Sequence, residues 1–479
     1  MPDHANSGMP WGTKLMAFTS VPTRQPNRRT TELLLVIGAW ILGVAGTMQI
    51  AWATGEGMTP RLWITVVIVG ILAGAMHVAV RLTAEYADPL FLPLATLLTI
   101  LGLVMIYRID VASALRAARN SAPVPTPDVY AQLTWFTVAV VLFIAVLVLV
   151  RDHRRLQRFT YTFGLIGLLG LLLPLLPVIG NTVNGATLWI RVFGLSFQPA
   201  EASKIFLTIF FAGYLVMKRD SLALVRTKVF GVGFPRPKDV GPLFVAWIIS
   251  LGVLIFQRDL GTSLLFFGLF VVMLYIATQR RSWLIIGASL FSVGAILAYF
   301  AFGHVRLRVD IWWDPWGDAN NTGYQLVQSL YGFASGGLFG SGLGQGFPEF
   351  VPFANTDFIV AAIGEELGLV GMCALLLFFG ILIERGLRTA IAVRDSFGQL
   401  LAVGLSIVLA LQLFVIVGGV TRLIPLTGLT TPFLSYGGSS LVANWVIIAL
   451  LIRISDRARR PDVFVPSVDE AFTQVVRRV

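Results

Sequence analysis

The chain has 479 residues, of which 56% are hydrophobic and only 13% are charged, and its mean hydropathy is +0.80. Because a soluble domain carries about 25% charged residues, this composition excludes a soluble enzyme and indicates a membrane protein. A net charge of +11 would suggest a nucleic-acid partner in a soluble protein. In a membrane protein it is typical of cytoplasmic Lys and Arg, so we expect no nucleic-acid partner. The single cysteine, Cys373, excludes an intramolecular disulfide and a cysteine-based metal site.

Residues 1–32 are polar and contain several prolines, and we expect them to form a disordered cytoplasmic tail. Twelve apolar runs follow, each close to the roughly 20 residues that a helix needs to cross a bilayer. They are 33–53, 62–80, 89–107, 133–150, 159–180, 199–217, 242–257, 263–278, 283–302, 358–383, 400–420 and 434–454. The seventh and eighth runs are short, so they form either a tight helical hairpin around residues 259–261 or one broken span. The hairpin keeps the number of spans even.

Basic residues are distributed unequally between the two sides of the predicted bundle. With both termini placed in the cytoplasm, 26 of the 36 Lys and Arg residues fall in cytoplasmic segments, 9 fall in outer loops, and Lys204 lies within a span. Cytoplasmic loops carry the excess of Lys and Arg in membrane proteins. We therefore expect both termini in the cytoplasm.

The segment 303–356 is the longest predicted outer loop. It carries the aspartates Asp310, Asp314 and Asp318, several aromatic residues and a glycine-rich stretch. Because ordering a long loop costs entropy, such loops usually have a function, and we expect the functional site on this face. A disordered linker is the alternative, which the aromatic content disfavours. The residue pattern alone does not choose among the three aspartates, since each could be a turn or capping residue.

Several ionisable residues lie within or at the ends of the spans, where they are costly and often functional. They are His77, Glu201, Lys204, Asp259, Glu365, Glu366 and Arg422. Glu201 and Lys204 stand three residues apart on one helix, so we expect them to pair, and this pair could serve only to hold helices together. Asp259 is expected to cap the next helix, and His77 to be satisfied inside the bundle. A cavity with both signs of charge suits a lipid-linked anionic substrate. A transporter, a channel and a lipid-acting enzyme all remain open at this point.

The segment 421–445, TRLIPLTGLTTPFLSYGGSSLVANW, is a long and specific motif. It resembles the signature of the SEDS family, the shape, elongation, division and sporulation proteins. Its residues SYGGSS favour the members of that family that serve cell elongation. Other stretches resemble further motifs of that family. They are NGATLWI (184–190), QPAEASK (198–204), DLGTS (259–263), DPWGDANNTGYQLVQS (314–329) and TDFIVAAIGEELGLVG (356–371).

The resemblance implies an all-α polytopic membrane protein with a core of ten spans, and thus about twelve transmembrane helices here. The family pattern begins at the third predicted span. We therefore divide the chain into the tail 1–32, an added helix pair 33–88, a SEDS core 89–455 that includes the loop 303–356, and a cytoplasmic tail 456–479.

The resemblance also implies a function. It indicates a peptidoglycan glycosyltransferase that polymerises lipid II on the outer face of the bacterial cytoplasmic membrane during elongation of the cell. Such an enzyme would work with a class B penicillin-binding protein, a transpeptidase. The alternatives are a lipid II flippase and a non-catalytic activator of that transpeptidase. A flippase needs a polar path through the membrane, whereas the polar groups here cluster toward the outer side.

The essential aspartate of the family aligns with Asp318, and we predict that it acts as the catalytic general base, because a sugar hydroxyl is a poor nucleophile at neutral pH. The diphosphate leaving group needs cations, for which Lys204, Arg306 and Arg308 are the candidates. The other predicted substrate-binding residues are Glu201, Trp189, Asp259, Gln328, Ser435, Gly437 and Gly438. Mg²⁺ or Mn²⁺ is a candidate cofactor because hard cations bridge diphosphate oxygens. Its ligands are unknown, and we expect no organic cofactor.

Some positions depart from the family pattern, namely Leu188, Arg258, Ala319, Asn321, Phe353 and Asn355. Asn321 stands where the pattern has Gly, three residues after Asp318. Phe353 and Asn355 replace a Glu and a His, so neither can act there as an acid or base. Leu188 replaces an Arg, and we expect no phosphate contact from it.

Overall fold

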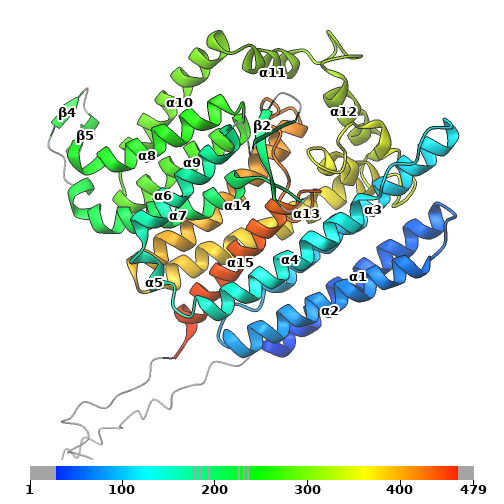
Figure 1. The fold of residues 1–479 in the computed structure, drawn as a ribbon, viewed down its shortest axis with the longest axis horizontal. Coiled ribbons are helices and arrows are strands. Elements are labelled where there is room, and N and C mark those ends of the chain that lie inside the picture. Colours follow the sequence, from blue (N-terminus) through cyan, green and yellow to red (C-terminus); the bar gives the residue numbers. More distant parts are fainter. Residues whose placement is uncertain are drawn as a thin grey trace, which may run out of the picture. The chain divides into compact units, whose positions relative to one another are not determined.

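The computed structural model describes residues 28–461, apart from 177–179, 184–185, 193–194, 224–226, 230–231 and 235–236 (Figure 1). Most of the two predicted tails lies outside the described residues. Helix α1 already begins at Arg29 and helix α15 ends at Arg459. A few residues of each predicted tail are therefore helical.

Helices dominate the described chain. They are α1 (Arg29–Ala53), α2 (Pro60–Thr83), α3 (Phe91–Arg119), α4 (Asp128–Leu149), α5 (Arg154–Gln157), α6 (Thr160–Leu172), α7 (Pro199–Ala223), α8 (Pro237–Phe256), α9 (Leu260–Thr278), α10 (Ser282–Ala301), α11 (Gly303–Trp313), α12 (Tyr324–Gly336), α13 (Ile359–Ala392), α14 (Ser396–Val420) and α15 (Gly438–Arg459). The 3-10 turns are η1 (Leu173–Leu175) and η2 (Pro348–Phe350). The strands β1 (Gly180–Val183), β2 (Ala186–Val192) and β3 (Leu195–Phe197) form one antiparallel sheet, and β4 (Thr227–Val229) pairs with β5 (Val232–Phe234).

Ten helices in the described residues are long and apolar enough to cross a membrane, so the predicted all-α polytopic fold is confirmed. The fifth predicted span is the shorter helix α6 followed by η1, and the seventh is α8. The structure resolves α8 and α9 as two helices that pack against each other, which confirms the hairpin. Arg258 in the turn has a left-handed φ of 63°. Asp259 then caps α9, because its carboxylate accepts from the Thr262 N–H at 2.9 Å.

Helix α15 lies at the centre of the bundle. Nearly all of it is buried, and it contacts α3, α4, α7, α13 and α14. The Trp445 ring in α15 packs against the rings of Phe136, Phe143 and Phe433. Through Phe433, the segment just before α15 is thereby packed against this buried helix.

The added pair α1 and α2 lies alongside α3 and α4 (Figure 1). Close approach of α1 to α3 requires a small residue, because a Cβ on Gly43 would come within 2.2 Å of the Ile100 side chain. Small residues at helix contacts let membrane helices pack closely. Helix α1 is thus packed closely on α3 at Gly43.

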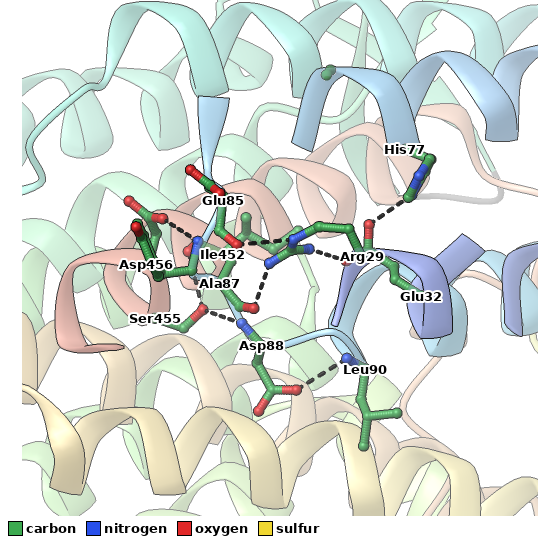
Figure 2. A network of polar contacts seen from close by, with 12 residues as sticks. Arg29, Glu32, His77, Glu85, Ala87, Asp88, Leu90, Ile452, Ser455 and Asp456 are labelled. Carbon is green, nitrogen blue, oxygen red and sulfur yellow. Dashed lines mark hydrogen bonds and ion pairs between the residues drawn. The ribbon is translucent and has the colours of Figure 1, made fainter. Parts of the chain in front are cut away.

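A buried polar network ties one end of this pair to the core (Figure 2). The Arg29 guanidinium pairs with Glu32 and donates to the backbone carbonyls of Glu85 and Ala87. Glu32 also contacts Nδ1 of His77 at 2.9 Å. The prediction that His77 is satisfied inside the bundle is therefore confirmed for Nδ1 alone, because its buried Nε2 has no hydrogen-bond partner among the described residues.

We expect Gly43→Ile to lower the free energy of unfolding by about 1–3 kcal/mol, the usual cost of overpacking a well-packed interface. The added side chain would push α1 away from Ile100 on α3. Thermal unfolding of the purified protein in detergent measures the effect. Gly38→Ile is the matched control on the same helix, since a Cβ at Gly38 would meet nothing within 4 Å. Equal melting temperatures for the two variants would contradict the packing argument.

Candidate functional site

The long segment 303–356 is ordered and about half helical, with α11 and α12 on either side of an exposed turn. This outcome excludes the disordered linker. The turn is anchored at both ends. The Asp314 carboxylate accepts from the Gly317 N–H at 3.2 Å, and the Asp318 carbonyl accepts from the Gly323 N–H at 3.0 Å.

Asp318 presents an exposed carboxylate at this turn. Its Oδ1 accepts from the Asn321 side-chain amide at 2.8 Å. Its Oδ2 accepts from the Thr322 hydroxyl at 2.8 Å and from the Thr322 N–H at 3.2 Å. Hydrogen bonds from Asn321 and Thr322 hold the pKa of Asp318 below its ordinary value. The carboxylate is therefore ionised and fixed in direction at neutral pH.

The signature loop, residues 421–437, is organised around Ser435. The buried Ser435 hydroxyl donates to the Thr356 carbonyl at 2.5 Å and accepts from the Thr431 N–H at 2.8 Å. Gln132 on α4 donates to the Ser435 carbonyl at 3.1 Å and accepts from the Gly437 N–H at 3.2 Å. The loop is thus joined both to α4 and to the end of the long outer segment.

Gly438, the first residue of α15, lies against the ring of Trp135. A Cβ at this position would come within 2.0 Å of that ring, so only glycine fits. The contact gives Gly438 a packing role. Its predicted role in substrate binding stays a prediction, as do those of Ser435 and Gly437.

A charged cluster lies beside the signature loop. Arg308 on α11 donates to the Leu426 carbonyl at 2.8 Å, and both Arg308 and Asp357 approach Gly428. Burial raises the pKa of Asp357 to about 6, although the positive charge of Arg308 opposes the shift. Asp259 is close enough for its charge to influence both groups. Opposite charges from the N-cap of α9, from α11 and from Asp357, two residues before α13, therefore converge at this loop.

Glu201 and Lys204 form the predicted ion pair on α7, and both side chains are buried. Lys204 Nζ also donates to Gln412 of α14 at 3.0 Å and to Asn444 of α15 at 3.2 Å. Gln412 in turn donates to the Thr430 carbonyl at 2.9 Å. The pair is thus connected to the signature loop through Gln412. No contact in the described part of the chain joins Lys204 to Asp318.

The remaining predicted residues lie apart from these contacts. The Arg306 guanidinium sits 5.6 Å from the centre of the Tyr299 ring and donates to the Phe300 carbonyl at 3.3 Å, toward α10. Trp189 lies in β2, opposite Asn181 of β1. Gln328 is half-buried on α12. The structure places these residues without joining them to Asp318 among the residues that it describes.

Glu366 and Arg108 form a buried ion pair that the sequence did not indicate. Arg108 Nε donates to Glu366 at 2.6 Å, and Glu366 also accepts from the Gly344 N–H at 3.0 Å. Glu365 accepts from the Phe347 N–H at 2.8 Å. These two acids therefore hold the glycine-rich stretch of the outer segment in place. Arg108 lies just beyond the third predicted span, which ended at residue 107, and α3 itself continues to Arg119.

Among the residues that the structure describes, no three His, Cys, Asp or Glu side chains gather closely enough to hold a metal ion. These residues thus offer no clustered ligand set for the divalent cation that remains a candidate cofactor.

Comparisons with known proteins identify the family. The family of FtsW, RodA and SpoVE, described as cell cycle proteins, matches residues 88–460. The chain is 50% identical over 473 residues to a protein of Mycobacterium tuberculosis named peptidoglycan glycosyltransferase RodA, covering 98% of this chain and 100% of that one. It is 34% identical to a probable peptidoglycan glycosyltransferase FtsW of Geobacter sp., covering 78% of this chain and 98% of that one.

Two solved structures share the fold. One is described as a peptidoglycan synthase complex that coordinates polymerisation and crosslinking, with a TM-score of 0.62, 26% identity and coverage of 78% of this chain and 99% of that one. The other is the rod shape determining protein RodA of Thermus thermophilus, with a TM-score of 0.55, 26% identity and coverage of 78% and 98%. The mycobacterial relative matches almost the whole chain, whereas the family match starts at residue 88, after α1 and α2. This chain belongs to the FtsW, RodA and SpoVE family of cell cycle proteins.

Proposed function

We propose that this multi-pass membrane protein is a peptidoglycan glycosyltransferase that polymerises lipid II into glycan strands during cell elongation. The observation that carries the proposal is the 50% identity to mycobacterial RodA over 98% of the chain. The ionised, exposed Asp318 supports it, because it lies in an ordered turn of the segment expected on the outer face.

Asp318 would accept the proton of the attacking sugar hydroxyl as that oxygen bonds to the anomeric carbon of the second saccharide. A positioned general base contributes about 10²–10⁴-fold. The bond from the anomeric carbon to the diphosphate breaks, and the leaving group takes the electron pair. Arg308, in the charged cluster beside the signature loop, is a predicted cation that would stabilise that negative charge.

The proposed site of action is the outer face of the bacterial cytoplasmic membrane, and the proposed partner is a class B penicillin-binding protein. The structural relative described as coordinating polymerisation and crosslinking supports a partner that crosslinks the new strand. The ten apolar helices support a multi-pass membrane location.

We expect chelation of divalent cations with EDTA to lower the polymerisation rate at least about tenfold, and Mg²⁺ or Mn²⁺ to restore it. The reason is that hard cations bridge diphosphate oxygens, so the cation would enter with the substrate. The initial rate of strand formation measures the effect. An unchanged rate after chelation would remove the cation from the proposal.

The direct test incubates the purified protein with fluorescent lipid II, alone and with a class B penicillin-binding protein, and separates the products by gel electrophoresis. We expect a ladder of glycan strands. Proteoliposomes carrying labelled lipid II test the flippase alternative in parallel. Movement of lipid II across the bilayer without strand formation would overturn the proposed enzyme in favour of a transporter. Strand formation only by the partner would make this protein an activator.

A further inference from the structure

We propose that Asn321 is a positioning residue that holds the Asp318 carboxylate in its reactive orientation, with Thr322 as the second half of the same clamp. Asn321 stands where the family pattern described above has Gly, so its side-chain amide is a departure of this chain from that pattern. The inference rests on the proposed function, because it assigns a role relative to Asp318.

The clamp occupies both carboxylate oxygens from one side of the turn. The Asn321 amide holds Oδ1 at 2.8 Å, while the Thr322 hydroxyl holds Oδ2 at 2.8 Å. Both distances are those of well-formed hydrogen bonds. An exposed aspartate without such partners would sample several rotamers, and fixing it removes that disorder before the substrate arrives.

The charged groups around the turn are engaged elsewhere. Asp314 accepts from the Gly317 N–H. Arg422 lies over the Trp316 ring at 5.2 Å and donates to the carbonyls of Trp312 and Trp313. Asp310 accepts from Tyr299. In the described residues the Asp318 carboxylate forms no ion pair with any of them, so its orientation depends on Asn321 and Thr322.

The hydrogen bonds of the clamp lower the pKa of Asp318, which makes it a weaker base. They also keep the carboxylate ionised and in one orientation. Asn321→Gly, which restores the pattern residue, should free one oxygen. We expect kcat to fall about tenfold with KM unchanged, because misorientation of a catalytic group affects the chemical step. Asn320→Gly is the matched control, since the exposed Asn320 lies next to Asn321; we expect it to retain the wild-type kcat.

Asn321→Asp tests the clamp by pH. It keeps the shape of the side chain, removes the donor and places a second negative charge beside Asp318. A nearby like charge disfavours the ionised form, so the pKa of Asp318 rises. Activity requires the ionised carboxylate and is lost as pH falls through that pKa. The acidic limb of the kcat profile should therefore move to higher pH than in the wild type.

A double-variant cycle separates positioning from a merely structural role. In the Asp318→Asn background, Asn321→Gly should cause no further loss of the residual rate. The clamp is overturned if Asn321→Gly keeps the wild-type kcat and Asn321→Asp keeps the wild-type acidic limb. That result, with Asp318→Asn inactive, would leave the proposed function standing. Normal polymerisation by Asp318→Asn would instead overturn the catalytic role of Asp318.

Discussion

Asp318→Asn is expected to lower the rate of lipid II polymerisation by at least about 10²-fold, with folding and membrane insertion intact. The amide has nearly the shape of the carboxylate but cannot accept the proton of a sugar hydroxyl, and a general base is typically worth about 10²–10⁴-fold. Because Asp318 is exposed and belongs to no buried network, its loss should not unfold the protein. Strand formation from fluorescent lipid II measures the rate, and thermal unfolding in detergent measures stability.

Asp314→Asn is the matched control in the same turn. Its carboxylate caps the backbone by accepting from the Gly317 N–H, a bond that the amide oxygen of Asn can also accept. We therefore expect this variant to keep most of its activity. Equal losses in the Asp314 and Asp318 variants would show that the turn's shape, and not one carboxylate, limits the reaction.

Local patterns in the sequence predicted the parts of the site whose geometry depends on nearby residues. Glu201 and Lys204 lie three residues apart on one helix, which brings their side chains to the same face, and the structure pairs them. Asp259 precedes a helix and caps it. Each result follows from backbone geometry over a few residues.

Long-range contacts could not be predicted in this way. Arg108 and Glu366 are separated by 258 positions, and the sequence around either residue does not predict that the two form an ion pair. The apolar run that marked the third span stopped at residue 107 because Arg108 is charged, yet α3 continues to Arg119 since Glu366 compensates that charge inside the bundle. Hydropathy treats a paired charge like an unpaired one, so it could not show that the helix continues past Arg108.

The connections of the signature loop show the same limit. Gln132 is an ordinary polar residue in the sequence, but in the structure it bonds to the backbone of both Ser435 and Gly437. Gln412 likewise connects Lys204 to the Thr430 carbonyl. Motif resemblance identified the loop, whereas the amides that hold it came from α4 and α14, far away in the chain.

Lys204→Met is expected to lower the free energy of unfolding by about 3–5 kcal/mol, the usual cost of breaking a buried ion pair. Met has nearly the volume of Lys, so the change leaves little cavity, but it leaves the Glu201 carboxylate buried without its partner. Gln412 and Asn444 would each lose a donor as well. Thermal unfolding of the purified protein measures the loss.

The double variant Glu201→Gln/Lys204→Met separates stability from catalysis. Removing both charges relieves the unpaired carboxylate, so we expect it to recover more than half of the stability that Lys204→Met loses. If Lys204 also binds the diphosphate, as the resemblance implies, the double variant should still bind lipid II more weakly than the wild type, even with its stability recovered. Recovery of both stability and lipid II affinity would show that the pair serves to hold α7 against α14 and α15, and that the diphosphate is bound elsewhere. A Lys204→Met protein as stable as the wild type would contradict the buried ion pair itself.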